Sequence, residues 1–250
     1  MEEAAARFPQ RKAYEDETCS MTFSEVRRLA ASIGTGIAAL ENPGRPVAVF
    51  MEKSVWMAVS LLGVSCGGCI YCPVDVAMPK ARMDRILSVL EPAAVLTSGS
   101  MGARAREACG NCPVLLVEDL AARPADEALL ASLRARIKSS DPLYILFTSG
   151  STGMPKGVVG THQTVLNNLE WLASRFDLGP DDVLGNQAPL HFVVADHDLY
   201  CPLKFGCSSF FIPAGYFSFP AKLIPLLNQH RVTTVFWVPF ALGTIASLRA

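Results

Sequence analysis

This chain has almost no net charge and lacks long apolar runs. Its 22 basic residues nearly balance its 23 acidic ones, so the formal net charge is −1. Without an excess of positive charge, no basic surface is expected to attract nucleic acid. No run reaches the roughly eighteen apolar residues that a membrane-spanning helix needs. The first residues, Met-Glu-Glu-Ala-Ala-Ala-Arg, lack the basic start of a signal peptide. We therefore expect a cytoplasmic protein that binds neither nucleic acid nor membranes.

Strand-like and helix-like segments alternate along the sequence. The 250 residues are 50% hydrophobic and 18% charged, enough for one large domain or two small ones. Strands are expected over residues 46–51, 93–97, 114–117, 143–148, 157–161, 183–187, 208–212 and 233–237. Helices are expected over residues 54–65, 78–90, 162–176, 196–205, 221–230 and 239–250, with another between 97 and 114. This alternation predicts an α/β fold with mostly parallel sheets flanked by helices.

The clearest helix start is a capping box, in which Thr22 caps the helix and Glu25 reaches back to it. Apolar residues then recur at helical spacing and predict one buried face, formed by Phe23, Val26, Leu29, Ala30, Ile33 and Ile37. Residues 121–126 are the most loop-like stretch and could separate two packed layers. No internal repeat or low-complexity tract is present.

The most informative stretch is residues 148–157, Thr-Ser-Gly-Ser-Thr-Gly-Met-Pro-Lys-Gly. It follows an apolar strand-like run, and its glycines allow backbone N–H groups to approach an anion closely. Hydroxyl groups and the Lys156 ammonium add further donors. The pattern predicts a phosphate-binding loop whose members are Thr148, Ser149, Gly150, Ser151, Thr152, Gly153, Lys156 and Gly157.

This loop is not a Walker A sequence, which places Gly-Lys-Ser or Gly-Lys-Thr directly before a helix. Here Lys156 follows Pro155 and precedes Gly157, and the apolar pair Val158 and Val159 comes next. The alternative is a polar surface turn between two strands. The order of ten consecutive residues favours phosphate binding.

In that order the loop resembles the phosphate loop of the AMP-forming adenylating enzymes, which include acyl-CoA synthetases, luciferases and the adenylation domains of nonribosomal peptide synthetases. The likeness covers essentially the whole chain. Residues 21–26, 67–75, 186–192 and 237–240 are similar to weaker family segments. Residues 185–200 look closest to amino-acid-activating members, especially D-alanine–carrier protein ligases.

The resemblance implies a carboxylic acid activated with ATP as an acyl-adenylate and then transferred to a thiol. That thiol would belong to a phosphopantetheinyl carrier protein or to CoA. ATP and Mg²⁺ are the expected cofactors, with Mg²⁺ bridging phosphate oxygens. Lys156 is the candidate catalytic residue, because it would offset charge as pyrophosphate leaves.

The resemblance also implies that residues 1–250 form part of the large N-terminal domain of such a ligase, without its small C-terminal domain. The family's adenine-binding segment, its ribose-binding Asp and its catalytic Lys would lie beyond Ala250. We therefore expect a truncated fold that adenylates weakly or not at all. A non-catalytic nucleotide-binding remnant is the alternative.

By the same resemblance, the acid pocket would be lined by Phe192, Val193, Val194, His197 and Trp237. Amino-acid-activating members carry a Phe-Asp pair whose Asp binds the substrate ammonium, and here Val193 follows Phe192. A buried ammonium without a counter-charge is costly. This favours an aryl or other amine-free acid. The alternatives are that Asp196 or Asp198 serves the ammonium, or that function is lost.

Metal binding is a further alternative. Cys66, Cys69 and Cys72 have C-x2-C-x2-C spacing, and Cys109 and Cys112 form another C-x2-C pair, as in zinc or iron–sulfur proteins. Their apolar, Gly-containing surroundings favour small buried thiols instead. His191, Asp196, His197 and Asp198 meet no ligand spacing rule and favour a helix start. No metal site is predicted.

Overall fold

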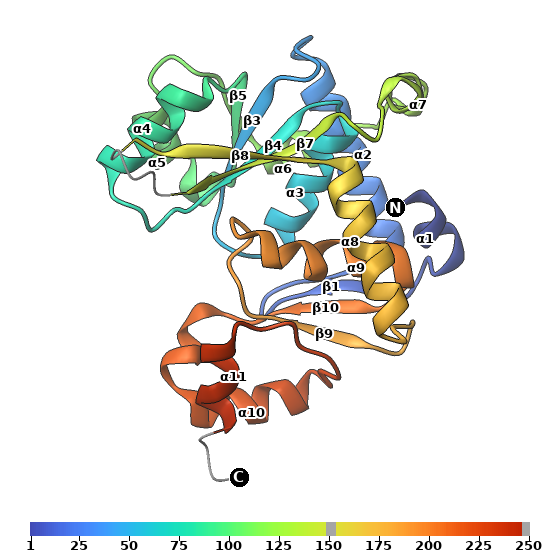
Figure 1. Ribbon diagram of the computed structural model, residues 1–250. Helices are drawn as coiled ribbons and strands as arrows, with labels where there is room; N and C mark the ends of the chain where they lie inside the picture. Colours follow the sequence, from blue (N-terminus) through green and yellow to red (C-terminus); the bar gives the residue numbers. More distant parts are fainter. Residues whose placement is uncertain (149–153, 247–250) are drawn as a thin grey trace. The chain divides into compact units, whose positions relative to one another are not determined.

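The computed structural model describes residues 1–148 and 154–246 (Figure 1). The chain divides into two compact units. Unit 1 comprises Met1–Val26, Lys53–Val55 and Asn168–Ala250, and unit 2 comprises Arg27–Glu52 and Trp56–Asn167. Helices α2 (Phe23–Ala38) and α8 (His162–Arg175) each begin in one unit and end in the other.

Unit 2 is built on a six-stranded sheet with the order β6-β5-β3-β4-β7-β8. Its strands are β3 (Pro46–Phe50), β4 (Ile70–Val74), β5 (Ala94–Thr97), β6 (Val114–Leu116), β7 (Pro142–Thr148) and β8 (Lys156–Thr161). All neighbours pair in parallel except β7 and β8, which form an antiparallel hairpin. The predicted mostly parallel α/β arrangement is confirmed.

Helices connect the strands of unit 2: α3 (Val55–Cys66), α4 (Lys80–Leu90), α5 (Gly102–Cys109), α6 (Val117–Ala121) and α7 (Glu127–Arg136), with a 3-10 turn at Gly99–Met101. Apolar residues of the sheet, α4 and α5 share a core. It contains Ala48, Phe50, Cys72, Val74, Met83, Leu90, Val95 and Ala105. Burial of this apolar surface is the main force that holds helices to the sheet.

Unit 1 contains a four-stranded sheet with the order β2-β1-β10-β9. Its strands are β1 (Lys12–Glu15), β2 (Ser20–Thr22), β9 (Val183–Asn186) and β10 (Ser208–Phe211). Its helices include α1 (Glu2–Arg7), α9 (Asp196–Phe205), α10 (Pro220–Gln229) and α11 (Pro239–Ala246), with 3-10 turns at Val193–Ala195 and Ala214–Ser218. A core of Phe210, Ile212, Leu223, Leu226, Trp237 and Ala241 joins β10 to the last two helices.

The predicted capping box is confirmed, and the helix expected from residue 162 begins there. The backbone N–H of Glu25 donates to Thr22 Oγ1 at 3.3 Å, and that of Thr22 donates to Glu25 Oε2 at 2.8 Å. The backbone N–H of Thr164 donates to Thr161 Oγ1 at 3.2 Å, which caps α8. The predicted apolar face of α2 is buried throughout.

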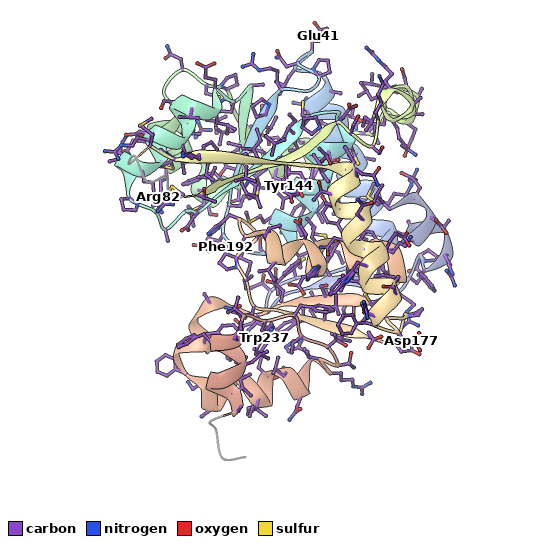
Figure 2. The ribbon with its side chains drawn as sticks, in the orientation of Figure 1. Glu41, Arg82, Tyr144, Asp177, Phe192 and Trp237 are labelled. Carbon is purple, nitrogen blue, oxygen red and sulfur yellow. The ribbon has the colours of Figure 1, made fainter. Side chains whose placement is uncertain are left out.

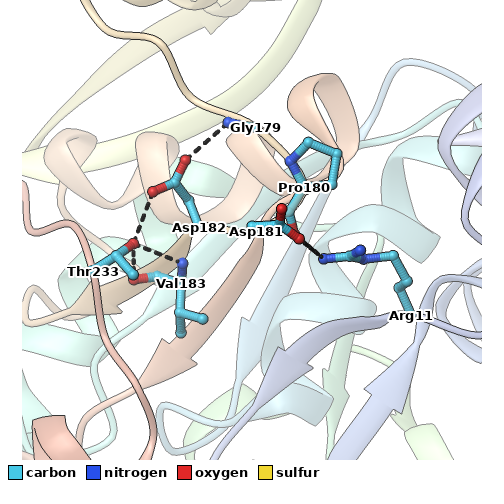
Figure 3. Close-up of polar contacts among 7 residues, drawn as sticks. All are labelled: Arg11, Gly179, Pro180, Asp181, Asp182, Val183 and Thr233. Atoms are coloured by element: carbon cyan, nitrogen blue, oxygen red, sulfur yellow. Dashed lines mark hydrogen bonds and ion pairs between the residues drawn. The ribbon is translucent and has the colours of Figure 1, made fainter.

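The predicted strand over residues 233–237 is wrong. Only one bridge forms, between Leu184 and Thr234. The Thr233 hydroxyl donates to Asp182 Oδ1 at 2.8 Å and accepts from the backbone N–H of Val183 at 3.0 Å (Figure 3). Beyond it, the Gly185 carbonyl that would accept the next ladder bond instead accepts the indole N–H of Trp237 at 2.6 Å. A side chain therefore takes the place of the ladder.

Candidate active site

The β7–β8 hairpin presents the predicted phosphate loop. Thr148 and Lys156 lie opposite each other as the last pair of the hairpin, at the carboxyl end of β7. Ligands of open α/β sheets bind at this end of the strands. Ser149, Gly150, Ser151, Thr152 and Gly153 lie outside the described residues.

Within the described part of the loop, Lys156 supplies a positive charge and Gly157 supplies backbone without a side chain. Both are exposed, and no hydrogen bond or ion pair from another described residue engages the Lys156 ammonium. A Cβ on Gly157 would lie 2.9 Å from Ile145 Cγ2 and 3.4 Å from the Phe147 ring. Any larger residue would push against β7. A free cation beside a bare backbone at a strand end suits an anionic ligand such as a phosphate.

The five candidate pocket residues all belong to unit 1. Phe192 and Val193 are 54% and 58% exposed, and Val194 is half-buried. They lie at the start of the 3-10 turn Val193–Ala195, which runs directly into α9. Figure 2 shows Phe192 at the surface of the molecule. These residues offer an apolar contact surface and no charge.

His197 lies in the first turn of α9, with its ring 5.0 Å from that of Phe236. Its Nδ1 atom is buried and has no hydrogen-bond partner among the described residues. Burial lowers the pKa of His197, so the neutral imidazole is favoured. His197 can therefore donate or accept one hydrogen bond without contributing charge. The sequence did not single out Phe236, because an aromatic residue in an apolar run carries no specific signal.

Trp237 is more deeply placed than a pocket-lining role requires. It is only 8% exposed and packs edge-on against Phe217 with ring centroids 5.3 Å apart. Its indole N–H already donates to the Gly185 carbonyl (Trp237 is labelled in Figure 2). Trp237 can therefore give the site only ring surface, while it holds α11 to β9.

A buried polar cluster lies at the two ends of the segment that carries Phe192 and Val193. Asn186 ends β9 and Asp198 lies in the first turn of α9; they are 0% and 1% exposed. The Asn186 side-chain amide donates to Asp198 Oδ2 at 2.7 Å. Lys53 Nζ donates to the Gln187 carbonyl at 3.1 Å.

Burial sets the protonation of this cluster. It raises the pKa of Asp198 to about 7, although the hydrogen bond from Asn186 and the charge of Lys53 both lower it. Burial also lowers the pKa of Lys53 to about 8, which the negative charge of Asp198 opposes. The sequence showed Asp198 only as an alternative counter-charge and missed Lys53, whose partners lie more than 130 residues away.

The cysteines do not form a metal centre in the described structure. Cys72 is fully buried in the unit 2 core, where burial raises its pKa to about 12. The Cys69 thiol donates to the Asn42 carbonyl at 3.3 Å, and burial raises the pKa of Cys109 to about 11. Among the described residues, no three His, Cys, Asp or Glu side chains are grouped to hold a metal ion.

Known proteins resemble this chain over nearly its whole length. Vanchrobactin synthetase VabF of Vibrio anguillarum is 30% identical over 257 residues, which cover 98% of this chain and 8% of VabF. The L-proline–[L-prolyl-carrier protein] ligase of Pseudomonas fluorescens is 28% identical over 97% of this chain and 50% of its own length. The chain thus spans half or less of these curated relatives.

A solved structure shows the same likeness in three dimensions. The nonribosomal peptide synthetase FmoA3, bound to α-methyl-L-serine-AMP, superposes with a TM-score of 0.84 at 27% identity, covering 98% of this chain and 27% of FmoA3. The family described as AMP-binding enzyme matches residues 1–250. The hairpin, the exposed lysine at its end and these relatives agree, and the chain belongs to the AMP-binding enzyme family, whose members here are AMP-forming ligases.

Proposed function

We propose that this chain binds ATP at the carboxyl end of β7 and takes part in activating a carboxylic acid as its adenylate. Transfer to a carrier-protein or CoA thiol would follow. The observation that carries the proposal is the exposed Lys156, without a described partner, at the end of the β7–β8 hairpin. We also propose that residues 1–250 form part of the large N-terminal domain of such a ligase. In support, the chain covers 64% of a solved structure described as the N-terminal domain of FACL13 from Mycobacterium tuberculosis.

Lys156 would act through charge and position. In adenylation a carboxylate oxygen forms a bond to the α-phosphorus of ATP, and the bond from that phosphorus to the pyrophosphate oxygen breaks. Such displacements depend on positioning and charge neutralisation more than on covalent help from the protein. The Lys156 ammonium and the backbone at Gly157 would hold phosphate oxygens. We propose that Mg²⁺ would accompany the bound nucleotide and would neutralise part of its phosphate charge.

The site favours an acid without an α-ammonium group. Residues 187–195 contain no acidic side chain, and Val193 is exposed. The nearest carboxylates along the chain, Asp196 and Asp198, are both buried, and Asp198 already accepts a hydrogen bond from Asn186. An ammonium bound here would lose water without gaining a counter-charge. The apolar side chains and the neutral His197 suit an aryl or other amine-free acid.

ATP–pyrophosphate exchange with a panel of amino, aryl and short aliphatic acids tests this function. Because this chain is expected to adenylate weakly or not at all by itself, the assay is run with a C-terminal ligase domain supplied. We then expect exchange with an amine-free acid and none with amino acids. Val193→Asp should shift the preference toward amino acids roughly 10-fold or more, because a hydrogen bond to a charged group is worth about 1.5–3 kcal/mol. Val89→Asp, at a valine 48% exposed on α4, is the control and should leave the preference unchanged.

Two other results would change the conclusion. Exchange of the unaltered chain with an α-amino acid would contradict the amine-free assignment. Folded protein that binds ATP and exchanges with no acid, even with that domain supplied, would favour a non-catalytic nucleotide-binding chain.

A further inference from the structure

The segment that carries the candidate acid contacts is fastened at both ends by one group of polar side chains. We infer that Lys53, Asn186 and Asp198 act together as a clasp that positions residues 187–195 for the acid. This inference rests on the proposed function. Lys53 and Asp198 are positioning residues in it, because they act through the main chain of the segment.

The clasp closes through three side chains from three separate elements. Lys53 Nζ holds the Gln187 carbonyl at 3.1 Å and lies 3.5 Å from the Asn186 carbonyl, where the segment leaves β9. The Asn186 side chain reaches across to Asp198 Oδ2 at 2.7 Å, where the segment has entered α9. The beginning and the end of the segment are thereby joined.

Each support of the clasp is itself anchored. The Ser209 hydroxyl donates to the Asp198 carbonyl at 2.6 Å, and the Tyr14 hydroxyl donates to the Leu199 carbonyl at 2.5 Å, which fixes α9 on the sheet. The stretch Lys53–Val55 is held by the backbone N–H of Val55, which donates to Asp16 Oδ2 at 2.8 Å. Within the segment, the Phe192 N–H donates to the Pro189 carbonyl at 3.0 Å.

The buried polar groups of the clasp make the fold less stable than apolar side chains of similar size would. Burying charged groups is expensive, and replacing them by well-packed apolar residues is often neutral or stabilising. Asn186 Oδ1, Asp198 Oδ1 and His197 Nδ1 are the buried side-chain polar atoms without a partner among the described residues, and they all lie in this region. Costs of this kind concentrate at functional sites. The clasp therefore fits a role in holding the acid better than a role in stability alone.

Hydrogen exchange of the free protein tests the clasp without any ligand. Lys53→Met keeps an apolar stem of similar length and removes the ammonium. We expect amides of residues 188–195 to exchange about 10-fold faster, as for local opening of a released loop, while β9, β10 and α9 keep their protection. Lys53→Arg should restore exchange to within about 3-fold, because a guanidinium also donates to carbonyls.

The matched control is Lys204→Met, at a lysine of α9 that makes an exposed ion pair with Glu170. It should leave exchange of residues 188–195 unchanged. Equal acceleration throughout unit 1, or none in the segment, would overturn the clasp.

Kinetics then links the clasp to the acid. With an acid found in the exchange panel, Lys53→Met should raise the KM for the acid about 10-fold and leave the KM for ATP within about 2-fold. A fall in kcat alone would contradict the positioning role. If no acid supports exchange even with the C-terminal ligase domain supplied, the proposed function fails, while the hydrogen-exchange result still decides whether the clasp exists.

Discussion

Lys156→Ala is expected to weaken ATP binding by about 10- to 150-fold, since a hydrogen bond to a charged group is worth about 1.5–3 kcal/mol. The thermal midpoint should not change. Lys156 is exposed at the end of the β7–β8 hairpin, and its ammonium has no bond to another described residue. Its removal therefore breaks no folded-state contact in the described structure, and the whole effect should fall on the bound anion.

Equilibrium dialysis of ATP with Mg²⁺ gives the dissociation constant directly and needs no catalytic turnover. Lys138→Ala, at another exposed lysine of unit 2, is the control for general loss of positive charge. ATP binding unaffected by Lys156→Ala would remove Lys156 from the site. Equal weakening by both variants would indicate only a diffuse electrostatic effect.

Gly160→Ala is expected to destabilise the protein by about 1–3 kcal/mol, the usual cost of overpacking. Gly160 lies directly opposite Tyr144 in the hairpin. A Cβ there would lie 2.1 Å from Tyr144 Cζ, far inside van der Waals contact. The ring cannot move aside, because Tyr144 is 3% exposed and packs against Tyr71 with centroids 5.8 Å apart.

Urea unfolding of the variant measures this cost. Gly99→Ala is a suitable control in the same unit, because a Cβ there would meet nothing closer than 3.7 Å. In a Tyr144→Leu background, Gly160→Ala should cost less than in the native chain, since the ring is gone. The same cost in both backgrounds would show that the ring is not the cause.

Because Gly160 and Lys156 share β8, we also expect Gly160→Ala to weaken ATP binding.

Local patterns in the sequence predicted most of the elements because their causes are local. The capping box at Thr22 and Glu25, the helical spacing of apolar residues in α2 and the Gly-rich stretch between β7 and β8 can each be recognised within about twenty residues. The order of residues 148–157 pointed to the family that the comparisons confirm.

Features made by distant residues were missed or mistaken. β1 is four residues long and pairs on one side with the short β2 and on the other with the distant β10. The run at residues 233–237 looked like a strand, but the Trp237 indole N–H donates to the Gly185 carbonyl that the strand would need as an acceptor.

Helix α7 was missed although its signal is local. Asp126 caps the helix by accepting a bond from the Leu129 N–H, and a search for Asp before a Leu-rich run would have found it.

The proposed acid site also combines residues that the sequence could indicate with residues that it could not. Phe192 and Val193 were identified by position in the chain, and both are exposed. The clasp could not be foreseen, because Lys53 and Asn186 are joined only by the folding of unit 1. A lysine in a loop and an asparagine at a strand end are unremarkable until burial places them together.

The sheet of unit 1 also constrains how the protein is made. Tyr14, on the first strand of that sheet, donates its hydroxyl to the Leu199 carbonyl, 185 residues later. At a translation rate of about 5–20 residues per second, its partner is synthesised roughly 10–40 s after it. During that time the edge of β1 that pairs with β10 in the folded sheet has no partner strand. An unpaired strand edge is open to pairing with other chains, so slower translation would lengthen the interval in which this edge is exposed to such association.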